Sequence, residues 1–404
     1  MVKIDPFSVE KWMDDHENDA KYNIAETCCA SISINDLCAL AENQSSSTSP
    51  LDLDRKLTYG PIRGSDALRD NLSRLYSSKA PSRLPNDQIL ITPGAIAANH
   101  LVFSSLIDQD DHVIVHHPTY QQLYAVPAAL GASISLWEAQ ASENWIPSIS
   151  TLKALIQPTT KLIVINNPNN PTGAILPKSL LQEIIDLAAS HSPPITILSD
   201  EVYRPIFHSI SPLDKAFPPS ILSMGYPHAI ATGSLSKAYS LAGIRVGWIA
   251  SRSPAIIEKC AAMRHYTTIS VSQLDEQIAA RALDSNTIHA LLARNINLAR
   301  TNLEILEKFI IKHDDIAEWV KPVAGTTAFV RFHREGKNVD AVAFCKALLK
   351  KTGVLFVPGD ECFGERFGGF ARVGFACETG LLKEGLEKAR VFLRKEFDDL
   401  PLAA

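Results

Sequence analysis

The stretch of sequence that decides the fold is Ser234-Leu235-Ser236-Lys237, with Arg245 eight residues after the lysine inside Gly243-Ile244-Arg245-Val246-Gly247. A lysine amine can add to a carbonyl group as a nucleophile. Serine hydroxyls and the fork of an arginine guanidinium can together bind a phosphate. Each of these residues alone occurs in many unrelated proteins. Ser-x-Ser-Lys followed at this offset by Gly-x-Arg-x-Gly is a far more specific sign of a shared function.

Four other segments accompany this stretch, three of them directly after an apolar run. They are Pro93-Gly94-Ala95, Asn167-Pro168-Asn169-Asn170-Pro171-Thr172-Gly173, Asp200-Glu201-Val202-Tyr203, and Arg372 within Phe370-Ala371-Arg372-Val373-Gly374. Taken singly they carry little weight, because an Asp-Glu pair is more often solvated and Asn-Pro and Pro-Thr-Gly are ordinary turn sequences. Their joint occurrence in this order is what carries information.

Short apolar runs alternate with helical patterns between about residues 87 and 250. Runs at 89–91, 113–115, 162–165, 195–198 and 229–231 are typical of strands covered on both faces. Apolar residues at helical spacing follow Pro177, between the third and fourth runs. The alternation predicts parallel strands in an α/β sandwich, whose ligands bind beyond the carboxyl ends of the strands. Beyond about residue 290, helical patterns at 288–312 and 339–351 surround short strands at 328–330 and 354–357, which predicts a smaller α+β domain.

With these motifs in this order, the sequence resembles the class I/II aminotransferase family, which has the fold of type I pyridoxal-phosphate enzymes. The resemblance extends from about Tyr59 to Phe375. It implies an α/β fold with a large domain around a mainly parallel sheet and a smaller α+β domain. We expect an N-terminal arm at 1–50 that is part of the small domain, a large coenzyme-binding domain at 51–288 and a small C-terminal domain at 289–404. The polar stretch Ser45-Ser46-Ser47-Thr48-Ser49-Pro50 would be a surface loop between arm and body.

The resemblance also implies roles around the ring of pyridoxal 5′-phosphate. Lys237 would carry the coenzyme as a Schiff base and, once freed, would move a proton at the α-carbon of the substrate. Asp200 would pair with the pyridine nitrogen and favour the protonated ring. Tyr203 and Asn170 would hydrogen-bond the phenolic oxygen of the ring, and Tyr120 would stack on its face. Lys237, Asp200 and Tyr203 are therefore the expected catalytic residues.

Further residues are expected at the phosphate and at the substrate. The phosphate ligands would be the N–H groups that open a helix, two hydroxyls and a guanidinium, from Gly94, Ala95, Ser234, Ser236 and Arg245. Tyr59 resembles the tyrosine that reaches the phosphate of the neighbouring subunit, which implies a homodimer with shared active sites. Arg372 would hold the substrate α-carboxylate, a planar bidentate task that lysine performs poorly, and Asn170 is also expected at the substrate. Arg264 lies in a candidate dimer-contact segment, residues 264–272, and no role is assigned to it.

Composition narrows the class of protein. A net charge of −5 gives no basic footprint for nucleic acid or an anionic membrane, and no apolar run reaches the roughly 18 residues of a membrane span. The first 18 residues do not have the pattern of a secretory signal. Seven scattered cysteines without a C-x-x-C pair indicate reduced thiols in a cytoplasmic protein, and Cys28 and Cys29 are expected to be small buried thiols. We predict no metal site.

These motifs are compatible with more than one type of reaction. The expected activity is an aminotransferase that acts on an amino acid and a 2-oxo acid, and the alternative is a lyase or cyclase of the same fold. The arm, with Trp12 upstream and Asn23-Ile24-Ala25-Glu26-Thr27-Cys28-Cys29-Ala30-Ser31, departs from the family's usual Gly-x-Pro-like stretch. It is similar to the branch of capreomycidine synthase and the arginine oxidases. We therefore entertain the hypothesis that Glu26 faces the side-chain pocket and favours a cationic substrate, against the alternative of a solvated surface glutamate.

Two other classes of protein share parts of this pattern. Ser234-Leu235-Ser236-Lys237 also matches the Ser-x-x-Lys of penicillin-recognising enzymes, and Lys351-Thr352-Gly353 matches their Lys-Thr-Gly. The Ser-x-Asn between these motifs is absent, and Gly353 is better explained as a helix terminus. A non-catalytic regulator of the same fold would carry an appended DNA-binding domain, and the first 50 residues show no basic helix-turn-helix pattern.

Overall fold

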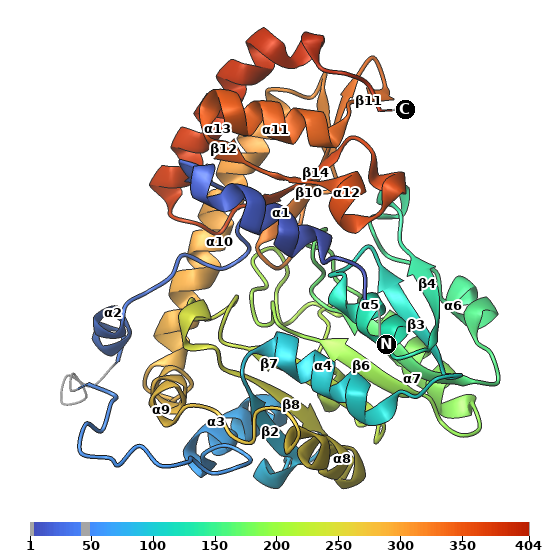
Figure 1. Ribbon diagram of the computed structural model, residues 1–404, viewed down its shortest axis with the longest axis vertical. Helices are drawn as coiled ribbons and strands as arrows, with labels where there is room; N and C mark the ends of the chain where they lie inside the picture. Colours follow the sequence, from blue (N-terminus) through green and yellow to red (C-terminus); the bar gives the residue numbers. More distant parts are fainter. Residues whose placement is uncertain (1–3, 42–48, 404) are drawn as a thin grey trace.

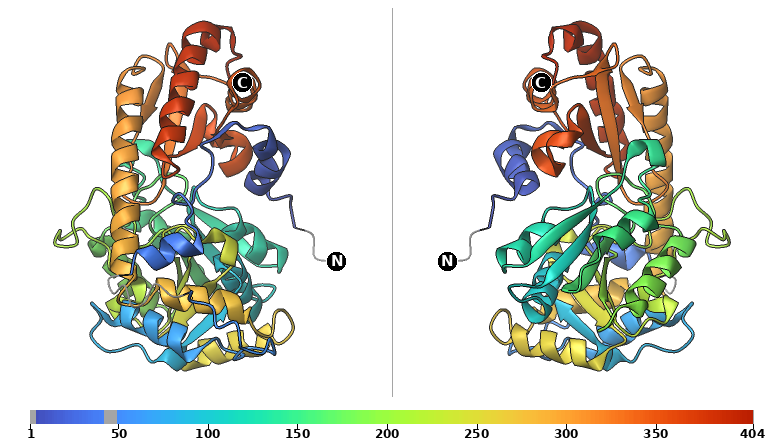
Figure 2. Two further views of the ribbon diagram at one scale, coloured as in Figure 1. Left: turned by 90° about the vertical axis from the view of Figure 1, so that its left-hand side faces the viewer. Right: turned by 90° about the vertical axis from the view of Figure 1, so that its right-hand side faces the viewer.

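Two sheets of unequal size form the framework of the protein. The computed structural model describes residues 4–41 and 49–403, so that most of the stretch from Ser45 to Pro50 lies outside the described residues. The larger sheet lies in the lower part of Figure 1 and the smaller one in the upper part. The long helix α10 (Ile288–Ile311) runs along one side of the molecule from one part to the other (Figures 1 and 2).

The larger sheet has seven strands. Their order is β2 (Ile89–Thr92), β8 (Gly247–Ser251), β7 (Ala229–Ser234), β6 (Thr196–Asp200), β5 (Thr160–Asn166), β3 (His112–His117) and β4 (Ser133–Glu138). Neighbours pair in parallel except at β8, which is antiparallel to both β2 and β7. The mainly parallel sheet is thus confirmed. The sequence did not predict β4 and β8. β4 is an edge strand with only one buried residue, so its sequence lacks the continuous apolar run that marks the central strands.

Helices cover both faces of this sheet. On one face lie α4 (Ala95–Leu106), α5 (Gln122–Ala129) and α8 (Pro254–Arg264), which pack on alternate strand residues such as Leu162 and Val164. On the other lie α3 (Asp66–Ser77), α6 (Ile149–Leu155), α7 (Lys178–Ser190) and α9 (Gln273–Ala282), on the side of Ile163 and Ile165. Because successive side chains of a strand point to opposite faces, the apolar runs supply both layers at once.

The smaller sheet is antiparallel. It consists of β11 (Lys337–Asn338), β10 (Thr327–Arg334), β14 (Phe370–Gly374) and β13 (Val357–Pro358), with β9 (Ala317–Trp319) also paired to β10. Helices α11 (Ala341–Thr352), α12 (Gly359–Phe363) and α13 (Thr379–Glu396) accompany it. α11 ends at Gly353, whose φ of +76° is the left-handed conformation that glycine adopts without strain, as the sequence predicted. The predicted strand at 354–357 is divided, because β12 (Val354–Leu355) pairs with the arm and β13 pairs with β14.

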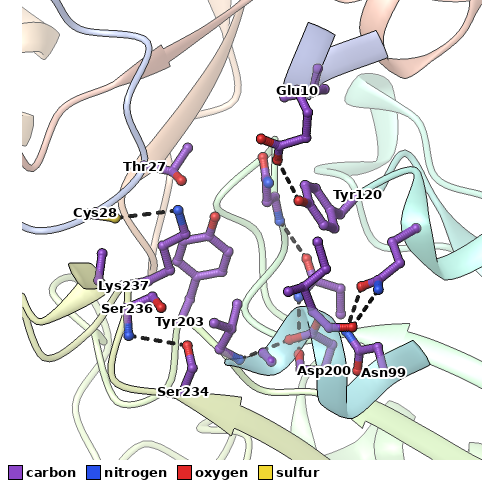
Figure 3. A pocket seen from close by; sticks show the side chains of 18 of the residues that line it. Glu10, Thr27, Cys28, Asn99, Tyr120, Asp200, Tyr203, Ser234, Ser236 and Lys237 are labelled. Atoms are coloured by element: carbon purple, nitrogen blue, oxygen red, sulfur yellow. Dashed lines mark hydrogen bonds between the residues drawn. The ribbon is translucent and has the colours of Figure 1, made fainter. Parts of the chain in front are cut away.

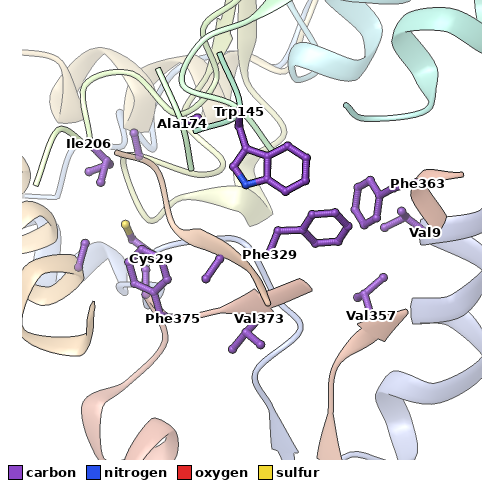
Figure 4. Packing of buried hydrophobic residues seen from close by; sticks show 14 of the residues in the cluster. Val9, Cys29, Trp145, Ala174, Ile206, Phe329, Val357, Phe363, Val373 and Phe375 are labelled. Carbon is purple, nitrogen blue, oxygen red and sulfur yellow. The ribbon is translucent and has the colours of Figure 1, made fainter. Parts of the chain in front are cut away.

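The N-terminal arm packs on the smaller sheet. It contains α1 (Ser8–His16), β1 (Tyr22–Asn23) and α2 (Ile34–Ala39), and β1 pairs in parallel with β12. The indole of Trp12 donates a hydrogen bond to the carbonyl of Phe356 (2.9 Å). Val9 lies near the rings of Phe363 and Phe329 in a cluster that also includes Trp145 from the loop after β4 (Figure 4). The arm therefore shares a core with the smaller sheet, while the exact domain boundaries stay predictions.

The segment after β1 passes between the two sheets. On the side of the smaller sheet, the N–H of Gly374 donates to the carbonyl of Ile24 (2.8 Å) and the N–H of Ala30 donates to Ala376 (2.8 Å). On the other side, the N–H of Cys29 donates to the carbonyl of Lys237 (3.1 Å). Residues 24–30 are thereby fixed against the loop that carries Lys237. None of the described helices is long and apolar enough to cross a membrane.

Candidate active site

A cavity of about 370 Å³ lies beyond the carboxyl ends of β5, β6 and β7, between the start of α4 and the arm (Figure 3). Eleven of the residues singled out in the sequence line it: Glu26, Ala95, Tyr120, Asn170, Asp200, Tyr203, Ser234, Ser236, Lys237, Arg245 and Arg372. The strand ends bring these side chains together although they are spread over more than 300 residues of sequence.

Lys237 follows β7 and points towards the arm (Figure 3). Its Nζ lies 3.4 Å from Oε1 of Glu26 and 3.4 Å from Sγ of Cys28. Burial alone would lower the pKa of Lys237, but the carboxylate of Glu26 beside it raises the pKa above the ordinary value. Burial also opposes ionisation of Glu26, yet Lys237 and hydrogen bonds from Cys28 and Thr27 lower the pKa of Glu26 to about 2. The structure thus places a carboxylate directly beside the amine.

Asp200 ends β6 and is only 4% exposed. Its Oδ2 accepts a hydrogen bond from the amide of Asn99 (2.9 Å), and its Oδ1 accepts one from the N–H of Val202 (3.1 Å). Burial raises the pKa of Asp200, and these hydrogen bonds act in the opposite direction. The hydroxyl of Thr232 in turn donates to Oδ1 of Asn99 (2.7 Å), which orients the amide. Asp200 is a buried carboxylate, and a positively charged hydrogen-bond donor in the cavity would neutralise its charge.

The start of α4 and Arg245 form a cradle for an anion. Gly94 precedes the helix with a φ of +84°, and a Cβ on it would lie 2.9 Å from Nη2 of Arg245. A Cβ on Gly247 would lie 2.6 Å from the backbone nitrogen of Ala95. The two glycines therefore let β8, Arg245 and the helix start approach one another. Nη1 of Arg245 also donates to Oγ of Ser236 (3.3 Å), which adds a hydroxyl to the cradle.

Arg372 stands on β14 at the opposite end of the cavity and is 3% exposed. Its Nη2 donates to the carbonyl of Ala25 (3.0 Å) and its Nη1 to Oδ1 of Asn170 (3.4 Å). Its Nε is buried without a hydrogen-bond partner among the described residues. A buried guanidinium with unused donor capacity is suited to bind a carboxylate.

Two tyrosines lie between these ends. Burial raises the pKa of Tyr203, so that its phenol stays protonated near neutral pH. Tyr120 donates its hydroxyl proton to Oε1 of Glu10 on α1 (2.5 Å), and its ring lies 4.7 Å from that of Phe7, measured between centroids. The arm thus contacts the tyrosine expected on the face of the coenzyme ring.

Tyr59 is the predicted site residue that lies elsewhere. It is 77% exposed and lines a separate groove with Gly60 and residues 270–274 of the same chain. Gly94 does not line the cavity itself but stands behind Arg245. Cys28 and Cys29 are both buried, as expected from the sequence.

Sequence reasoning missed Asn99, Glu10 and the contact of Cys28 with Lys237. Asn99 lies four residues after Ala95, and on a helix this spacing places it on the same face, towards the cavity. That spacing was the signal that could have found it. Glu10 and Cys28 gave no comparable signal, because their position depends on how the arm folds over the larger sheet.

These donors fit pyridoxal phosphate. The cradle of Arg245 and the α4 N-terminus suits a phosphate, the buried carboxylate of Asp200 suits a protonated ring nitrogen, and the Lys237 amine suits an aldehyde. The free Nε of Arg372 suits a substrate carboxylate. Among the described residues, no group of three or more His, Cys, Asp or Glu side chains could hold a metal ion.

Comparison with known proteins agrees with this chemistry. Residues 37–388 match the family model described as aminotransferase class I and II. The chain is 29% identical to capreomycidine synthase of Streptomyces vinaceus over 94% of this chain and 91% of the relative. It is 27% identical to an aspartate aminotransferase of Thermotoga maritima over 84% of each chain. The crystal structure of a PLP-dependent aminotransferase from Streptococcus suis superposes with a TM-score of 0.87 and 40% identity, covering 97% of this chain and 98% of that one.

Proposed function

The chain belongs to the class I and II aminotransferase family, and on this basis we propose that it removes the amino group of an amino acid with Lys237 as the coenzyme-binding residue. It is a pyridoxal-phosphate-dependent enzyme with the type I fold. The observation that carries the proposal is one cavity in which the amine of Lys237, the buried carboxylate of Asp200 and the guanidinium of Arg372 converge.

Bound pyridoxal phosphate supplies an aldehyde that takes up an amine and a ring that accepts electrons from the α-carbon of the substrate. Arg372 binds and orients the α-carboxylate through the nitrogen that has no other partner. Lys237, whose amine lies in the cavity, accepts and returns the proton at the α-carbon. Asn170, hydrogen-bonded to Arg372, holds this arrangement from the loop after β5.

The remaining residues bind the coenzyme. Asp200 would hold the proton on the ring nitrogen, Tyr203 and Asn170 would hydrogen-bond the phenolic oxygen, and Tyr120 would lie against the ring. The phosphate would be held at the start of α4 and by side chains around it: Gly94, Ala95, Ser234, Ser236 and Arg245. Asp200, Tyr203 and Ser234 are buried, which would exclude water from this part of the site and strengthen the charge interaction of Asp200, whereas Arg245 is exposed.

We propose that the enzyme is a homodimer in which Tyr59 completes the phosphate site of the partner. Tyr59 and Leu57 are 77% and 72% exposed beside the groove formed with residues 270–274. Tyr266, 87% exposed, belongs to the segment that the sequence marked as a dimer contact. In the same segment Ile269 has a φ of +56°, which is strained for a β-branched residue, and buried Arg264 finds no hydrogen-bond partner among the described residues. All of these features are of the kind that a partner surface would complete.

We also propose a cytoplasmic location, supported by free cysteines throughout the described part of the chain. The proposed substrates are small amino acids and 2-oxo acids.

A second candidate function is a lyase or cyclase that acts on a cationic amino acid. With the coenzyme and the α-carboxylate in place, Arg245, Asp200 and Arg372 have partners of opposite charge. Glu10 and Glu26 are carboxylates that also line the cavity, and they favour a positively charged side chain. The 29% identity to capreomycidine synthase over 94% of this chain supports the same interpretation.

A single experiment separates the two functions. The purified holoenzyme is mixed with a panel of amino acids in the absence of a 2-oxo acid, and both the coenzyme absorbance and the product masses are followed. A transaminase consumes one equivalent, forms one oxo acid and loses the coenzyme absorbance until an oxo acid is added. A lyase or cyclase turns over repeatedly and retains the absorbance. Glu26→Gln should raise KM for a cationic substrate, and unchanged kinetics would remove Glu26 from the substrate pocket.

A further inference from the structure

Glu26 is held in a fixed position by the backbone of its own segment. Its Oε1 accepts hydrogen bonds from the N–H of Thr27 (2.5 Å) and the N–H of Cys28 (3.0 Å). Its own N–H donates to Oδ1 of Asn23 (3.2 Å), which also accepts from the N–H of Ala25. A carboxylate that accepts two backbone N–H groups is pre-oriented and stabilised as an anion. The side chain is 44% exposed, so these two backbone donors and not burial fix its position.

The same oxygen lies 3.4 Å from Nζ of Lys237, 211 residues further along the chain. Other titratable groups near this amine are Cys28, Tyr203 and Tyr120. Burial raises the pKa of Cys28 to about 11 and also raises the pKa of both tyrosines, so that all three are neutral near pH 7. Glu26 is the neighbour that carries a negative charge there.

We propose that Glu26 is the counter-charge of Lys237: its carboxylate keeps the amine protonated in the coenzyme-free protein and directs it towards the arm. This inference rests on the proposed function, because it concerns the residue proposed to bind the coenzyme. It assigns Glu26 a task before any substrate arrives, in addition to its proposed contact with a cationic side chain.

The consequence is that the rate of coenzyme binding at Lys237 depends on the protonation of its amine. Only the neutral amine attacks an aldehyde. The ammonium form must first release one proton to solvent. Nζ then forms a carbon–nitrogen double bond with the aldehyde carbon, and the aldehyde oxygen leaves as water with the two remaining amine hydrogens. Because the Glu26 carboxylate favours the ammonium form, the capture rate should rise with pH until the amine is neutral.

The test uses the coenzyme-free protein and two readouts of Lys237. The first is the rate at which added pyridoxal phosphate is captured, followed by absorbance between about pH 7 and 12, a range that spans the ordinary lysine pKa of about 10.4. The second needs no coenzyme: the protein is briefly acetylated at each pH, and acetylation of the Lys237 peptide is quantified by mass spectrometry. Glu26→Gln keeps an oxygen to accept from Thr27 and Cys28 but removes the charge.

We expect Glu26→Gln to lower the apparent pKa of Lys237 by about one to three units, the usual effect of a charge at this distance. At a pH below both values, capture and acetylation should each accelerate by about 10- to 1000-fold. The matched control is Glu10→Gln, which removes another carboxylate of the cavity that bonds Tyr120 and not Lys237, and its shift should be much smaller.

Equal shifts in both variants, or no shift in Glu26→Gln, would overturn the assignment. If Glu26→Gln does not fold, the acetylation profile of the unaltered protein still decides, because an apparent pKa below about 10.4 for Lys237 contradicts a stabilised ammonium. Failure of the unaltered protein to bind pyridoxal phosphate at Lys237 would instead refute the proposed function, and the acetylation readout would remain interpretable.

Discussion

Replacement of Asn99 by alanine tests how the coenzyme ring is held. The amide of Asn99 donates to Oδ2 of Asp200 at 2.9 Å, and both side chains are buried, at 1% and 4% exposure. Water cannot easily take the place of this donor. A hydrogen bond to a charged group contributes about 1.5–3 kcal/mol. Since burial already raises the pKa of Asp200, loss of the amide should raise it further and reduce the fraction of carboxylate that can pair with the ring nitrogen.

The expected result is a dissociation constant for pyridoxal phosphate that is about 10- to 150-fold higher in Asn99→Ala. The loss should grow as the pH falls, because Asp200 then becomes protonated at a higher pH than in the unaltered protein. The assay is a titration of the coenzyme-free protein with pyridoxal phosphate, followed by absorbance, at several pH values. Circular dichroism establishes that the variant is folded.

Thr232→Val provides the matched control. It removes the hydroxyl that donates to Oδ1 of Asn99 (2.7 Å) but leaves the amide bond to Asp200 in place. A bond between neutral groups contributes only about 0.5–1.5 kcal/mol, so the affinity should fall by about tenfold at most. Unchanged affinity in Asn99→Ala, or an equal loss in Thr232→Val, would refute the idea that the amide acts through the charge of Asp200.

Three further outcomes follow from the site and the core. Lys237→Ala should abolish turnover and borohydride-stable attachment of the coenzyme, and full activity in this variant would refute the central assignment. Arg372→Lys should raise KM for the amino acid while coenzyme affinity stays unchanged, and an equal loss of both would place Arg372 in the coenzyme site instead. Burial lowers the pKa of His116 to about 3, compared with about 6.5 in the unfolded chain. The fold therefore has its full stability above about pH 6.5 and loses part of it as the pH falls towards 3. Denaturant unfolding should show a free energy of unfolding that is lower by about 2 kcal/mol at pH 5. This loss should be absent in His116→Gln and retained in His100→Gln, and the same pH dependence of the unfolding free energy in all three proteins would contradict the prediction.

Continuous apolar runs made the larger sheet predictable. β3, β5, β6 and β7 are covered by helices on both faces, so nearly every residue in them is buried, and an uninterrupted apolar run marks each of them in the sequence. β4 at the edge carries no such run. β8 does contain the short apolar run Trp248-Ile249-Ala250, which was not predicted as a strand. Strand pairing along β12 and β13 was unpredictable for another reason. The change of partner at Phe356 depends on the arm, which lies more than 300 residues away in sequence.

Three of the predicted coenzyme-binding residues lie together in the cavity because they stand at the ends of neighbouring strands of the same sheet. Asn170, Asp200 and Lys237 come after β5, at the end of β6 and after β7, and parallel neighbours bring their carboxyl ends to one edge. Asn99 was within reach of the same reasoning through its helical spacing from Ala95. The contacts of Lys237 with the arm were not, since residues 211 positions apart in a segment without periodicity leave no local pattern.

The arm also explains why the two ends of the site are coupled. A Cβ on Gly374 would lie 1.8 Å from the carbonyl oxygen of Glu26, so only glycine lets the arm lie against β14 at this point. β14 carries Arg372, which donates to the carbonyl of Ala25 in the same segment, and the next residues of the arm contact Lys237. Residues 24–30 therefore connect Arg372, the proposed carboxylate-binding residue, with Lys237, the proposed proton-transfer residue. Because the charged group of that segment is Glu26, we expect a change of sequence there to alter both the position of Lys237 and the charge beside its amine.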